Sequence, residues 1–391
     1  MIYQEPELTD ADRHVLNLIK EQREKLSIYT NHNLRRWFGT LRKATLARAI
    51  RGSISIEGYD ATLDEAMAAV EEDDPPLDER TETWLAINSY RLAMTYILQT
   101  YQDSTFEFGK QFLKSLHFMM LQWDMSKSPG QWRSREIYVV DDRLPDPVYE
   151  APDHEEVDAL IDELVEYIRE GTSTSILIKA AMAHLNLTMI HPFRDGNGRM
   201  ARALQTLVLS QDGLNHPIFS SIEEWLGRNT PEYYKALEKM SNGKWAPEYD
   251  ASSWIRFCLT AHYQQALTII RRHEEYDALF ERIERVISDN QLHERTTIPL
   301  FDCALGMRMN NSKYQREADV SVHVATRDLK QLVEADLLQP YGEKRGRHYY
   351  GSEKLRDHRA NTRVKKPVPN PYEAYETSDP LPLEEPPLPG F

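Results

Sequence analysis

The feature that most constrains this chain is a polar, glycine-containing run, HPFRDGNGRMAR, at residues 191–202. The segments on either side of it, residues 176–187 and 203–209, have the apolar content that is typical of buried helices. The polar run is therefore expected to be a loop between two buried helices, with its glycines at the N-terminus of the second helix. Helical patterns also dominate the rest of the chain, so the sequence predicts a mainly α-helical fold.

A loop of this kind is suited to binding phosphate groups. The first N–H groups of a helix and the positive end of its dipole attract anions, and glycines let a ligand approach the backbone closely. The expected phosphate nest consists of Gly196, Asn197 and Gly198. Arg199 and Arg202 lie three residues apart, on one helical face, and their charges favour a di- or triphosphate.

Two further residues of the run have the chemistry of a catalytic site. Asp195 lies beside the nest, where a carboxylate commonly holds Mg²⁺ together with phosphate oxygens. His191 precedes the nest by five residues and is a candidate base for a hydroxyl that attacks phosphorus. Each residue alone has an ordinary structural alternative: His191 could cap a helix, Asp195 could bind local N–H groups, and the arginines could be solvated.

Together the residues fill the pattern H-P-F-x-[DE]-G-N-G-R-x-x-R. Its fixed positions are occupied by His191, Pro192, Phe193, Asp195, Gly196, Asn197, Gly198, Arg199 and Arg202. In this motif the chain resembles the Fic (Fic/Doc) family, and the resemblance spans roughly residues 42–275. It implies a protein adenylyltransferase that moves AMP from ATP, with Mg²⁺, to a Ser, Thr or Tyr hydroxyl of a protein. His191 would be the general base, Asp195 the Mg²⁺ ligand, and the glycines and arginines the phosphate-binding groups.

A second segment gains meaning from this resemblance. Many Fic proteins carry an inhibitory helix with the pattern [ST]-x-x-x-E-[GN], which Ser53, Glu57 and Gly58 match. In the family this glutamate pairs with the second motif arginine, here Arg202, and obstructs the γ-phosphate. A glutamate in the last turn of a helix also meets the negative end of the helix dipole, so Glu57 requires a cation from elsewhere. The alternative is a surface glutamate beside a turn.

Residues 131–140 alternate like a strand after the turn Ser128-Pro129-Gly130. Fic proteins have at this place a β-hairpin flap, often introduced by G-x-x-R, and Gly130 and Arg133 fit that introduction. The docking edge for an extended target segment would be Ile137, Tyr138, Val139 and Val140. Because strand addition uses main-chain hydrogen bonds, the flap does not identify the target.

A run at residues 229–237 also resembles the family, in which an asparagine four residues before a Tyr-Tyr pair lines the adenine pocket. That role is carried over to Asn229 and Tyr233. Asn229 could equally be the N-cap of a helix with Pro231 in its first turn.

Composition limits the compartment and the general partners. A net charge of −15 argues against nucleic-acid binding through the whole surface. Two cysteines without metal-type spacing exclude a disulfide framework, and the first residues lack the pattern of a signal peptide. No apolar run reaches eighteen residues, so no membrane association is expected. We expect a cytoplasmic protein, with self-modification and a homodimer both compatible with the sequence.

Residues 276–360 differ in composition from the preceding part of the chain. Helical segments at about 278–290, 297–306 and 310–317 precede a recognition-type helix at 322–335 and a hairpin-like YGEKRGRHYYG at 341–351. This order resembles a winged helix-turn-helix. From Pro340 to Lys366 there are nine Lys/Arg against three acids, so residues 276–366 are a candidate DNA-binding region. The alternative is a protein-interaction or dimer module.

The sequence thus predicts four regions. They are an N-terminal helical region (1–110) with an inhibitory helix at about 42–58, a Fic catalytic core (111–275), a winged-helix domain (276–360) and a disordered, proline-rich acidic tail (361–391). Three other functions stay open: use of UTP or GTP, hydrolytic removal of AMP with Glu57 orienting water, and a transcriptional regulator whose Fic domain senses nucleotide.

Overall fold

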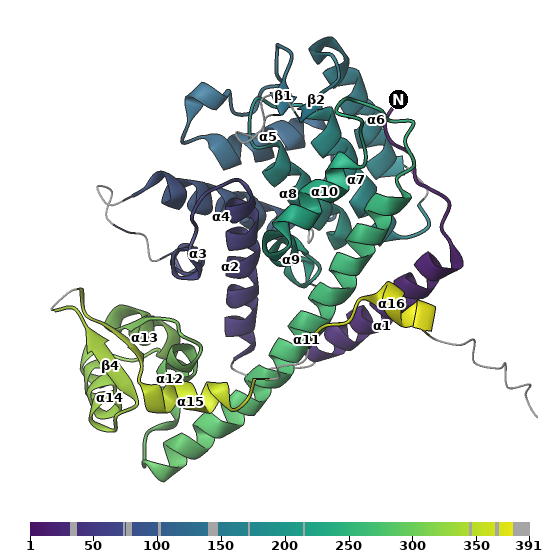
Figure 1. Ribbon diagram of the computed structural model, residues 1–391. Coiled ribbons are helices and arrows are strands. Elements are labelled where there is room, and N and C mark those ends of the chain that lie inside the picture. The colour runs from purple at the N-terminus through teal and green to yellow at the C-terminus, as the bar shows by residue number, and fades with distance from the viewer. Residues whose placement is uncertain are drawn as a thin grey trace, which may run out of the picture.

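The computed structural model describes residues 1–31, 37–72, 75, 80–100, 103–139, 148–170, 173–213, 216–343, 346–363 and 367–377. It is mainly helical, as the sequence predicts (Figure 1). The helices are α1 Asp10–Asn31, α2 Phe38–Ile56, α3 Leu63–Val70, α4 Glu82–Thr100, α5 Lys110–Leu121, α6 Val157–Glu170, α7 Ile176–Ile190, α8 Asn197–Ser210, α9 Glu223–Arg228, α10 Thr230–Glu238, α11 Ser252–Asp289, α12 Thr297–Ala304, α13 Asn311–Ala318, α14 Val322–Glu334, α15 Glu353–Ala360 and α16 Pro371–Thr377. The strands are β1 Tyr138–Val139, β2 Tyr149–Glu150, β3 Met309–Asn310, β4 Leu338–Tyr341 and β5 His348–Gly351.

The pair α7 and α8 lies at the centre of a helical body made of α1–α10 and the first half of α11 (Figure 1). Almost every residue of α7 is buried, which explains why its sequence is apolar on all sides. Helix α8 is buried along its whole length as well, including Arg199 and Arg202. The loop between them is therefore held by two helices that cannot move independently of the core.

Helix α11 is one continuous helix of 38 residues that joins two hydrophobic cores. Near its start, Trp254 packs in the helical body and its Nε1 donates to the Ala181 carbonyl at 2.8 Å. Near its end, Tyr276 and Ile283 belong to the second core. The predicted boundary at 275/276 falls inside α11, and the helical segment predicted at about 278–290 is the C-terminal part of the same helix.

The second core is shared between the C-terminal module, residues 291–360, at the far end of α11 (Figure 1), and residues of α1, α2 and α11. Helices α12, α13 and α14 pack beside a three-stranded antiparallel sheet of order β3-β5-β4, in which Tyr341 pairs with His348. These elements lie at the expected helices 297–306, 310–317 and 322–335 and the hairpin 341–351. The naming of the module as a winged helix stays a prediction. Lys344, Arg345 and residues 364–366 of the basic stretch lie outside the described residues.

Part of the expected disordered tail is ordered. Helix α16 packs against α1 and α11, and the Tyr372 hydroxyl donates to Asp12 Oδ1 at 3.0 Å. Arg256 lies over the same tyrosine ring at 5.8 Å, and Gln264 Nε2 donates to the Pro369 carbonyl at 3.1 Å. The prediction of disorder from residue 361 is therefore wrong for this segment, because two tyrosines among polar neighbours give no periodic signal. Residues 378–391 lie outside the described residues.

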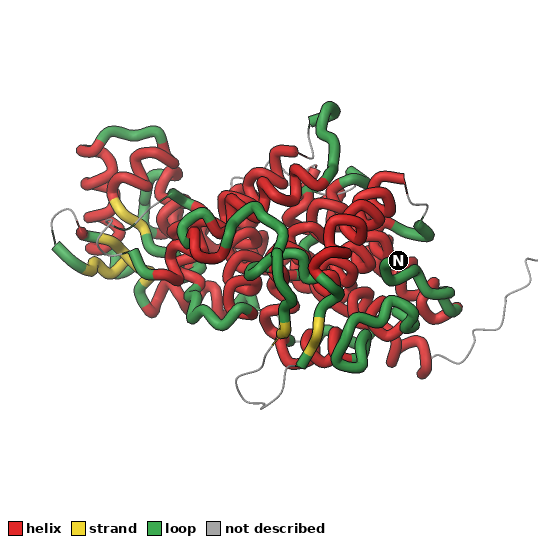
Figure 2. Tube along the Cα trace, turned by 90° about the horizontal axis from the view of Figure 1, so that it is seen from above, coloured by secondary structure: helices red, strands yellow, loops and turns green. Residues whose placement is uncertain are grey.

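The strands occur in two separate places, as Figure 2 shows. One place is the C-terminal module, and the other is the two-stranded hairpin of β1 and β2 beside α5 and the loop at 191–196. None of the helices in the described ranges combines the length and the apolar character needed to cross a membrane.

Candidate functional site

His191 ends α7 in the left-handed conformation, with φ of 51°, and its N–H donates to the Leu187 carbonyl at 3.2 Å. Its Nδ1 lies 3.1 Å from the Thr188 carbonyl oxygen. Since a carbonyl oxygen only accepts, Nδ1 must carry the proton and Nε2 keeps its lone pair. Burial lowers the pKa of His191 to about 4, so the imidazole is neutral at pH 7. The side chain is thus prepared to accept a proton at Nε2.

The turn between His191 and α8 is braced by the side chain of Asn197. Its Oδ1 accepts from the Phe193 N–H at 2.9 Å, and its Nδ2 donates to the Phe193 carbonyl at 2.8 Å. Gly196 adopts φ of 77° as the N-cap of α8, a conformation that glycine tolerates and most residues do not. The amide side chain of Asn197 therefore holds the loop, and only its backbone N–H is available for the nest proposed from the sequence.

Arg199 and Arg202 are both 1% exposed, and each has N–H groups that no protein atom accepts. The atoms without a hydrogen-bond partner are Nε and Nη1 of Arg199 and Nη1 of Arg202. A buried guanidinium with unsatisfied donors is costly, because it has lost its water and has not replaced it. The arrangement is that of a site prepared for an anion with several oxygens.

Glu57 provides one carboxylate to this region. Arg202 Nη2 donates to Glu57 Oε1 at 2.6 Å, and Arg199 Nε lies 3.7 Å from Oε2. Burial disfavours the charge of Arg202, but the neighbouring Glu57 carboxylate raises the pKa of this guanidinium above its usual value. The ion pair that the sequence analysis proposes is thus a direct contact between the end of α2 and the first turns of α8.

The Glu57 carboxylate also covers Gly198. A Cβ atom added at Gly198 would lie 2.7 Å from Glu57 Oε1 and 3.0 Å from Arg202 Nη1. The glutamate oxygen therefore rests against the N-terminal backbone of α8, where an anionic ligand would otherwise lie.

Ser53 fixes α2 in this position. Arg202 Nε donates to Ser53 Oγ at 2.8 Å, and Arg202 Nη2 donates to the Ser53 carbonyl at 3.0 Å. The residue before Ser53, Gly52, packs directly on the Glu223 carbonyl, where no side chain would fit. These contacts determine how closely α2 approaches α8 and α9.

Asp195 is 30% exposed and lies between two cations. Its Oδ2 is 3.0 Å from Lys127 Nζ, and its Oδ1 is 3.3 Å from Arg199 Nη2. Burial raises the pKa of this carboxyl, but Arg199 and Lys127 more than offset that effect, and the net pKa is below its usual value. An ionised, part-exposed carboxylate beside the phosphate-type nest is a suitable oxygen ligand for Mg²⁺.

The part of the chain that contains this site is similar to known proteins. Residues 107–209 match the family model described as the Fic/DOC family. This segment of the chain is similar to the Fic/DOC family. The matched segment contains the loop, both motif arginines and His191, and Glu57 precedes it.

Similarity to known proteins extends beyond that segment. The chain is 28% identical over 254 residues to the protein adenylyltransferase Fic of Drosophila mojavensis, which covers 63% of this chain and 45% of that protein. It is 28% identical over 122 residues to a probable protein adenylyltransferase of Aquifex aeolicus, covering 31% of this chain and 34% of that protein. The chain thus spans less than half the length of these curated relatives.

Two solved structures share the fold. A Fic family protein from Desulfovibrio desulfuricans matches with a TM-score of 0.58 at 20% identity, covering 90% of this chain and 99% of that chain. A Fic domain containing signaling protein from Bacteroides thetaiotaomicron matches with a TM-score of 0.54 at 20% identity, covering 66% and 96%. The first match covers 90% of this chain, so the similarity of fold extends beyond the helical body.

The hairpin of β1 and β2 lies where the sequence predicts a flap. Val148 N–H donates to the Val139 carbonyl at 2.8 Å, and Ala151 N–H donates to the Ile137 carbonyl at 3.3 Å. Strand β2 is bonded on its other side by residues 243–245, whereas β1 pairs only with β2 among the described residues. The outer edge of Tyr138 and Val139 is therefore open to another strand, and Val140 lies outside the described residues.

The two residues proposed for the adenine pocket differ in their surroundings. Asn229 is the N-cap residue of α10, with Pro231 in the first turn, as the alternative predicted, although its side chain donates to the Trp225 carbonyl at 2.8 Å and makes no cap hydrogen bond. Tyr233 is 1% exposed, and its hydroxyl bonds His184 Nε2 at 2.9 Å. Tyr234 is the exposed member of the pair and donates to the Ile56 carbonyl at 3.0 Å, against the end of α2.

Sequence reasoning missed two residues that support the loop from other elements. Arg133 Nε donates to the His191 carbonyl at 2.9 Å, and its backbone N–H donates to the Pro192 carbonyl at 2.8 Å. His117 bonds the Asp195 carbonyl through Nε2 at 2.9 Å and stacks on Phe193 at 3.7 Å. The G-x-x-R spacing pointed to Arg133, but nothing in the sequence around His117 connects it to residue 195.

Below α8, His184 and His262 contact the two ends of the Gln205 side chain. Burial lowers the pKa of each histidine from 6.5 to about 3. In the unfolded chain both imidazoles take up a proton below about pH 6.5, while in the folded protein they do not. Their contribution to stability is therefore complete above pH 6.5 and is lost as the pH falls toward 3.

We expect the unfolding free energy to fall by about 1.4 kcal/mol per pH unit below pH 6 for each of these two histidines. Urea unfolding at pH 7.5, 6.5 and 5.5 measures this slope. His184→Gln, which keeps a hydrogen-bonding side chain without the titration, should have a shallower slope than wild type. Equal slopes for the two proteins would contradict the assignment.

Proposed function

We propose that this protein transfers AMP from ATP to a Ser, Thr or Tyr hydroxyl of a protein, and that Glu57 restrains the reaction. The observation that carries the proposal is the anion site at the start of α8. There, two buried arginines have unused donors while one glutamate oxygen rests on Gly198. A site that already holds a carboxylate against a helix N-terminus and two guanidinium groups is suited to the phosphates of a nucleotide.

In this proposal the side chains have separate roles. Nε2 of His191 accepts the proton of the incoming hydroxyl, and the hydrogen bond from Nδ1 to Thr188 keeps the ring in the required tautomer. The N–H groups of Gly196, Asn197 and Gly198 hold phosphate oxygens at the helix N-terminus. Arg199 and Arg202 neutralise the β/γ end, so positioning and electrostatics provide most of the catalysis.

Asp195 would hold Mg²⁺, which would neutralise charge on the α- and β-phosphates. Support comes from its ionised, part-exposed carboxylate and from Lys127, which already places a cation 3.0 Å from Oδ2. Asn229 and Tyr233 are proposed for the adenine end, with Tyr233 acting from behind the pocket through α10.

The target would dock on the flap. The open edge at Ile137, Tyr138 and Val139 offers main-chain groups to an extended segment, and Val140 would continue it. Tyr138 is 49% exposed at this edge, which suits contact with a partner.

Other nucleotides and the reverse reaction share the same groups. Nothing in the anion site discriminates ATP from UTP or GTP. Removal of AMP from a modified protein would use Glu57 to orient water instead of blocking the γ-phosphate. A pure nucleotide sensor would not need the neutral, correctly protonated His191, which favours the transfer reaction.

Mass spectrometry of the purified protein after incubation with ATP and Mg²⁺ tests the proposal. Transfer to the protein itself adds one AMP to the intact mass, and Glu57→Gly is included because wild type is expected to be restrained. Parallel incubations with UTP and GTP identify the nucleotide. Absence of any nucleotide adduct on both proteins and on a cell extract would contradict transfer.

A second function, duplex DNA binding, is proposed for the C-terminal module. The observation that favours it is the exposed face of α14, where the Arg327 and Lys330 side chains are 61% and 75% exposed. Both positions lie on the helix that a winged helix-turn-helix would place in the major groove. One measurement of salt dependence distinguishes DNA binding by the module from the alternative, protein interaction.

We expect the full-length protein to bind duplex DNA with an affinity that falls steeply with salt, by about 0.9 log units per log unit of salt for each phosphate contacted. Fluorescence anisotropy at 50, 100 and 200 mM salt measures the slope. Arg327→Gln with Lys330→Gln should weaken binding and flatten that slope, whereas Lys20→Gln on α1 should change neither. Absence of binding to any duplex at low salt would assign the module to protein contacts.

A further inference from the structure

Helix α2 is shared between the two cores of the protein. In its second half, Ile50 and Ile54 are fully buried in the core of the helical body. At its start, Leu41 and the preceding residue Trp37 are buried in the second core, which the C-terminal module shares with α11. The helix that ends at Glu57 is therefore anchored at both ends, once against Arg202 and once against the module.

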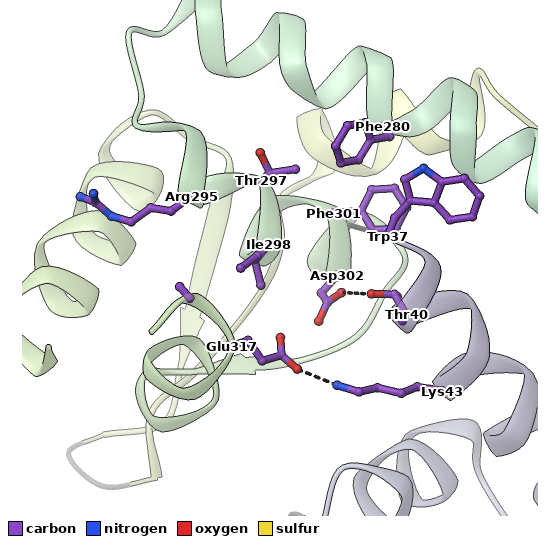
Figure 3. Close-up of a pocket in the computed structure, with 12 residues that line it drawn as sticks. Trp37, Thr40, Lys43, Phe280, Arg295, Thr297, Ile298, Phe301, Asp302 and Glu317 are labelled. Carbon is purple, nitrogen blue, oxygen red and sulfur yellow. Dashed lines mark hydrogen bonds and ion pairs between the residues drawn. The ribbon is translucent and has the colours of Figure 1, made fainter. Parts of the chain in front are cut away.

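The anchor on the module is a set of ion pairs and hydrogen bonds. Lys43 of α2 lies 2.7 Å from Glu317 Oε1 of α13, and the Thr40 hydroxyl contacts Asp302 of α12 at 3.3 Å, as Figure 3 shows. Beside them, Lys313 of α13 lies 2.7 Å from Glu71, which follows α3. We call this set of residues, Thr40, Lys43, Glu71, Asp302, Lys313 and Glu317, the junction.

The junction brings three carboxylates and two lysines close together. Carboxylate oxygens of Glu71, Asp302 and Glu317 lie within 4.8 Å of one another. Two lysines compensate these three acids, and Lys313 is also 2.9 Å from Asp302. Burial raises the pKa of Glu71 and of Asp302, although Lys313 acts in the opposite direction. Removing or reversing the charge of Lys43 would leave like charges facing each other across the contact.

The junction is also incompletely packed. A cavity of about 500 Å³ lies between α2 and the module, bordered by Trp37, Gly39, Phe280, Ile298, Phe301 and Ala318 (Figure 3). Around this cavity the contact consists of ion pairs and open space, and such a contact costs less to rearrange than a dry, close-packed core. The module can therefore shift against α2 without unfolding either body.

We propose that the C-terminal module controls the Glu57–Arg202 contact through α2, with the junction as the coupling element. The inference rests on the proposed inhibitory role of Glu57 and adds what regulates it. Helix α2 has 19 residues and is roughly 28 Å long, so a displacement at Lys43 reaches Glu57 as the tilt of one rigid rod. A partner that binds α14 acts on α13, its neighbour in the module, and thereby on Glu317 and Lys313.

Charge reversal at the junction tests this coupling. Lys43→Glu should raise AMP incorporation about two- to fivefold, the factor that a part-exposed ion pair of this kind represents. Glu317→Lys should act in the same direction, and the double variant, Lys43→Glu with Glu317→Lys, should return to the wild-type level. Lys43→Met removes the charge and keeps the length of the side chain, so it serves as a second variant in case Lys43→Glu unfolds locally. Lys25→Glu, at the exposed pair with Glu274 between α1 and α11, is the matched control and should have no effect.

Two further measurements separate the coupling from the proposed function. In the Glu57→Gly background, Lys43→Glu should add nothing, because the contact that it loosens is already absent. Hydrogen exchange of residues 50–58 should be faster in Lys43→Glu than in wild type, whether or not the protein transfers AMP. If Glu57→Gly transfers AMP while Lys43→Glu matches wild type in both incorporation and exchange, the coupling is wrong. If no variant transfers AMP but exchange still responds to Lys43→Glu, the coupling stands and the proposed function fails.

Discussion

His191→Ala is expected to reduce AMP transfer by about 10²–10⁴-fold, the usual loss for a general base, while ATP binding stays close to wild type. The reason is geometric. His191 ends α7 and directs its unprotonated Nε2 away from Thr188, whereas the groups proposed to hold phosphates begin at Gly196. Removing the imidazole therefore takes away the proton acceptor and leaves the anion site complete.

The measurement is incorporation of labelled AMP, with ATP affinity determined separately by calorimetry. Both are best made in the Glu57→Gly background, where transfer is expected to be fast enough to measure a large loss. His14→Ala, on the exposed face of α1, is the control for the general effect of losing a histidine. A His191→Ala protein that transfers AMP at the full rate with unchanged ATP affinity would remove His191 from the mechanism.

Glu57→Gly is expected to raise AMP incorporation by about 5- to 150-fold, the range of ordinary coupling energies between linked sites. In wild type, the carboxylate holds Arg202 at 2.6 Å and rests against Gly198, so both the arginine and the helix N-terminus are occupied. Glycine removes the carboxylate and frees Arg202 for the terminal phosphate. Ser53 still accepts from Arg202, so the arginine keeps its position.

Incorporation by wild type and Glu57→Gly is compared at equal ATP, with circular dichroism as the test of folding. Glu57→Gln should be intermediate, because the amide keeps a hydrogen bond to Arg202 and loses the charge. Glu24→Gly, at an exposed pair with Lys20, is the control. Equal or lower incorporation by a folded Glu57→Gly would rule out autoinhibition, and release of AMP from a modified target would then be measured to test the hydrolytic role.

The sequence predicts the local parts of this site well. The loop from His191 to Arg202 is determined by its own residues, since the glycine turn, the two flanking apolar helices and the arginine spacing are all short-range features. Helix α2 was expected at about 42–58 and occupies Phe38–Ile56 for the same reason. The fold class also follows directly, because helical periodicity extends along most of the chain.

The parts that the sequence does not predict depend on contacts between distant segments. Lys127 reaches Asp195, and His117 reaches the carbonyl of the same residue, from elements about 70 residues earlier. The burial of Tyr233 behind α8 depends on His184 of α7, so its spacing from Asn229 could not show which tyrosine of the pair faces the end of α2. Two tyrosines, Tyr372 and Tyr375, hold α16 by contacts with Asp12 and His14 of α1 that leave no periodic pattern.

The uninterrupted course of α11 through both cores has a consequence for how related chains can vary in length. One residue inserted between Ala261, in the first core, and Ile269, in the second, would turn everything beyond it by about 100° and advance it by about 1.5 Å. The module would then present a different side to α2, and Glu317 would no longer face Lys43. An insertion compensated by a deletion, or an insertion close to a whole number of helical turns, would restore the orientation of the module. The number of residues between the cores is therefore constrained by the rotation of the helix. The identity of the exposed residues in between is not constrained in this way.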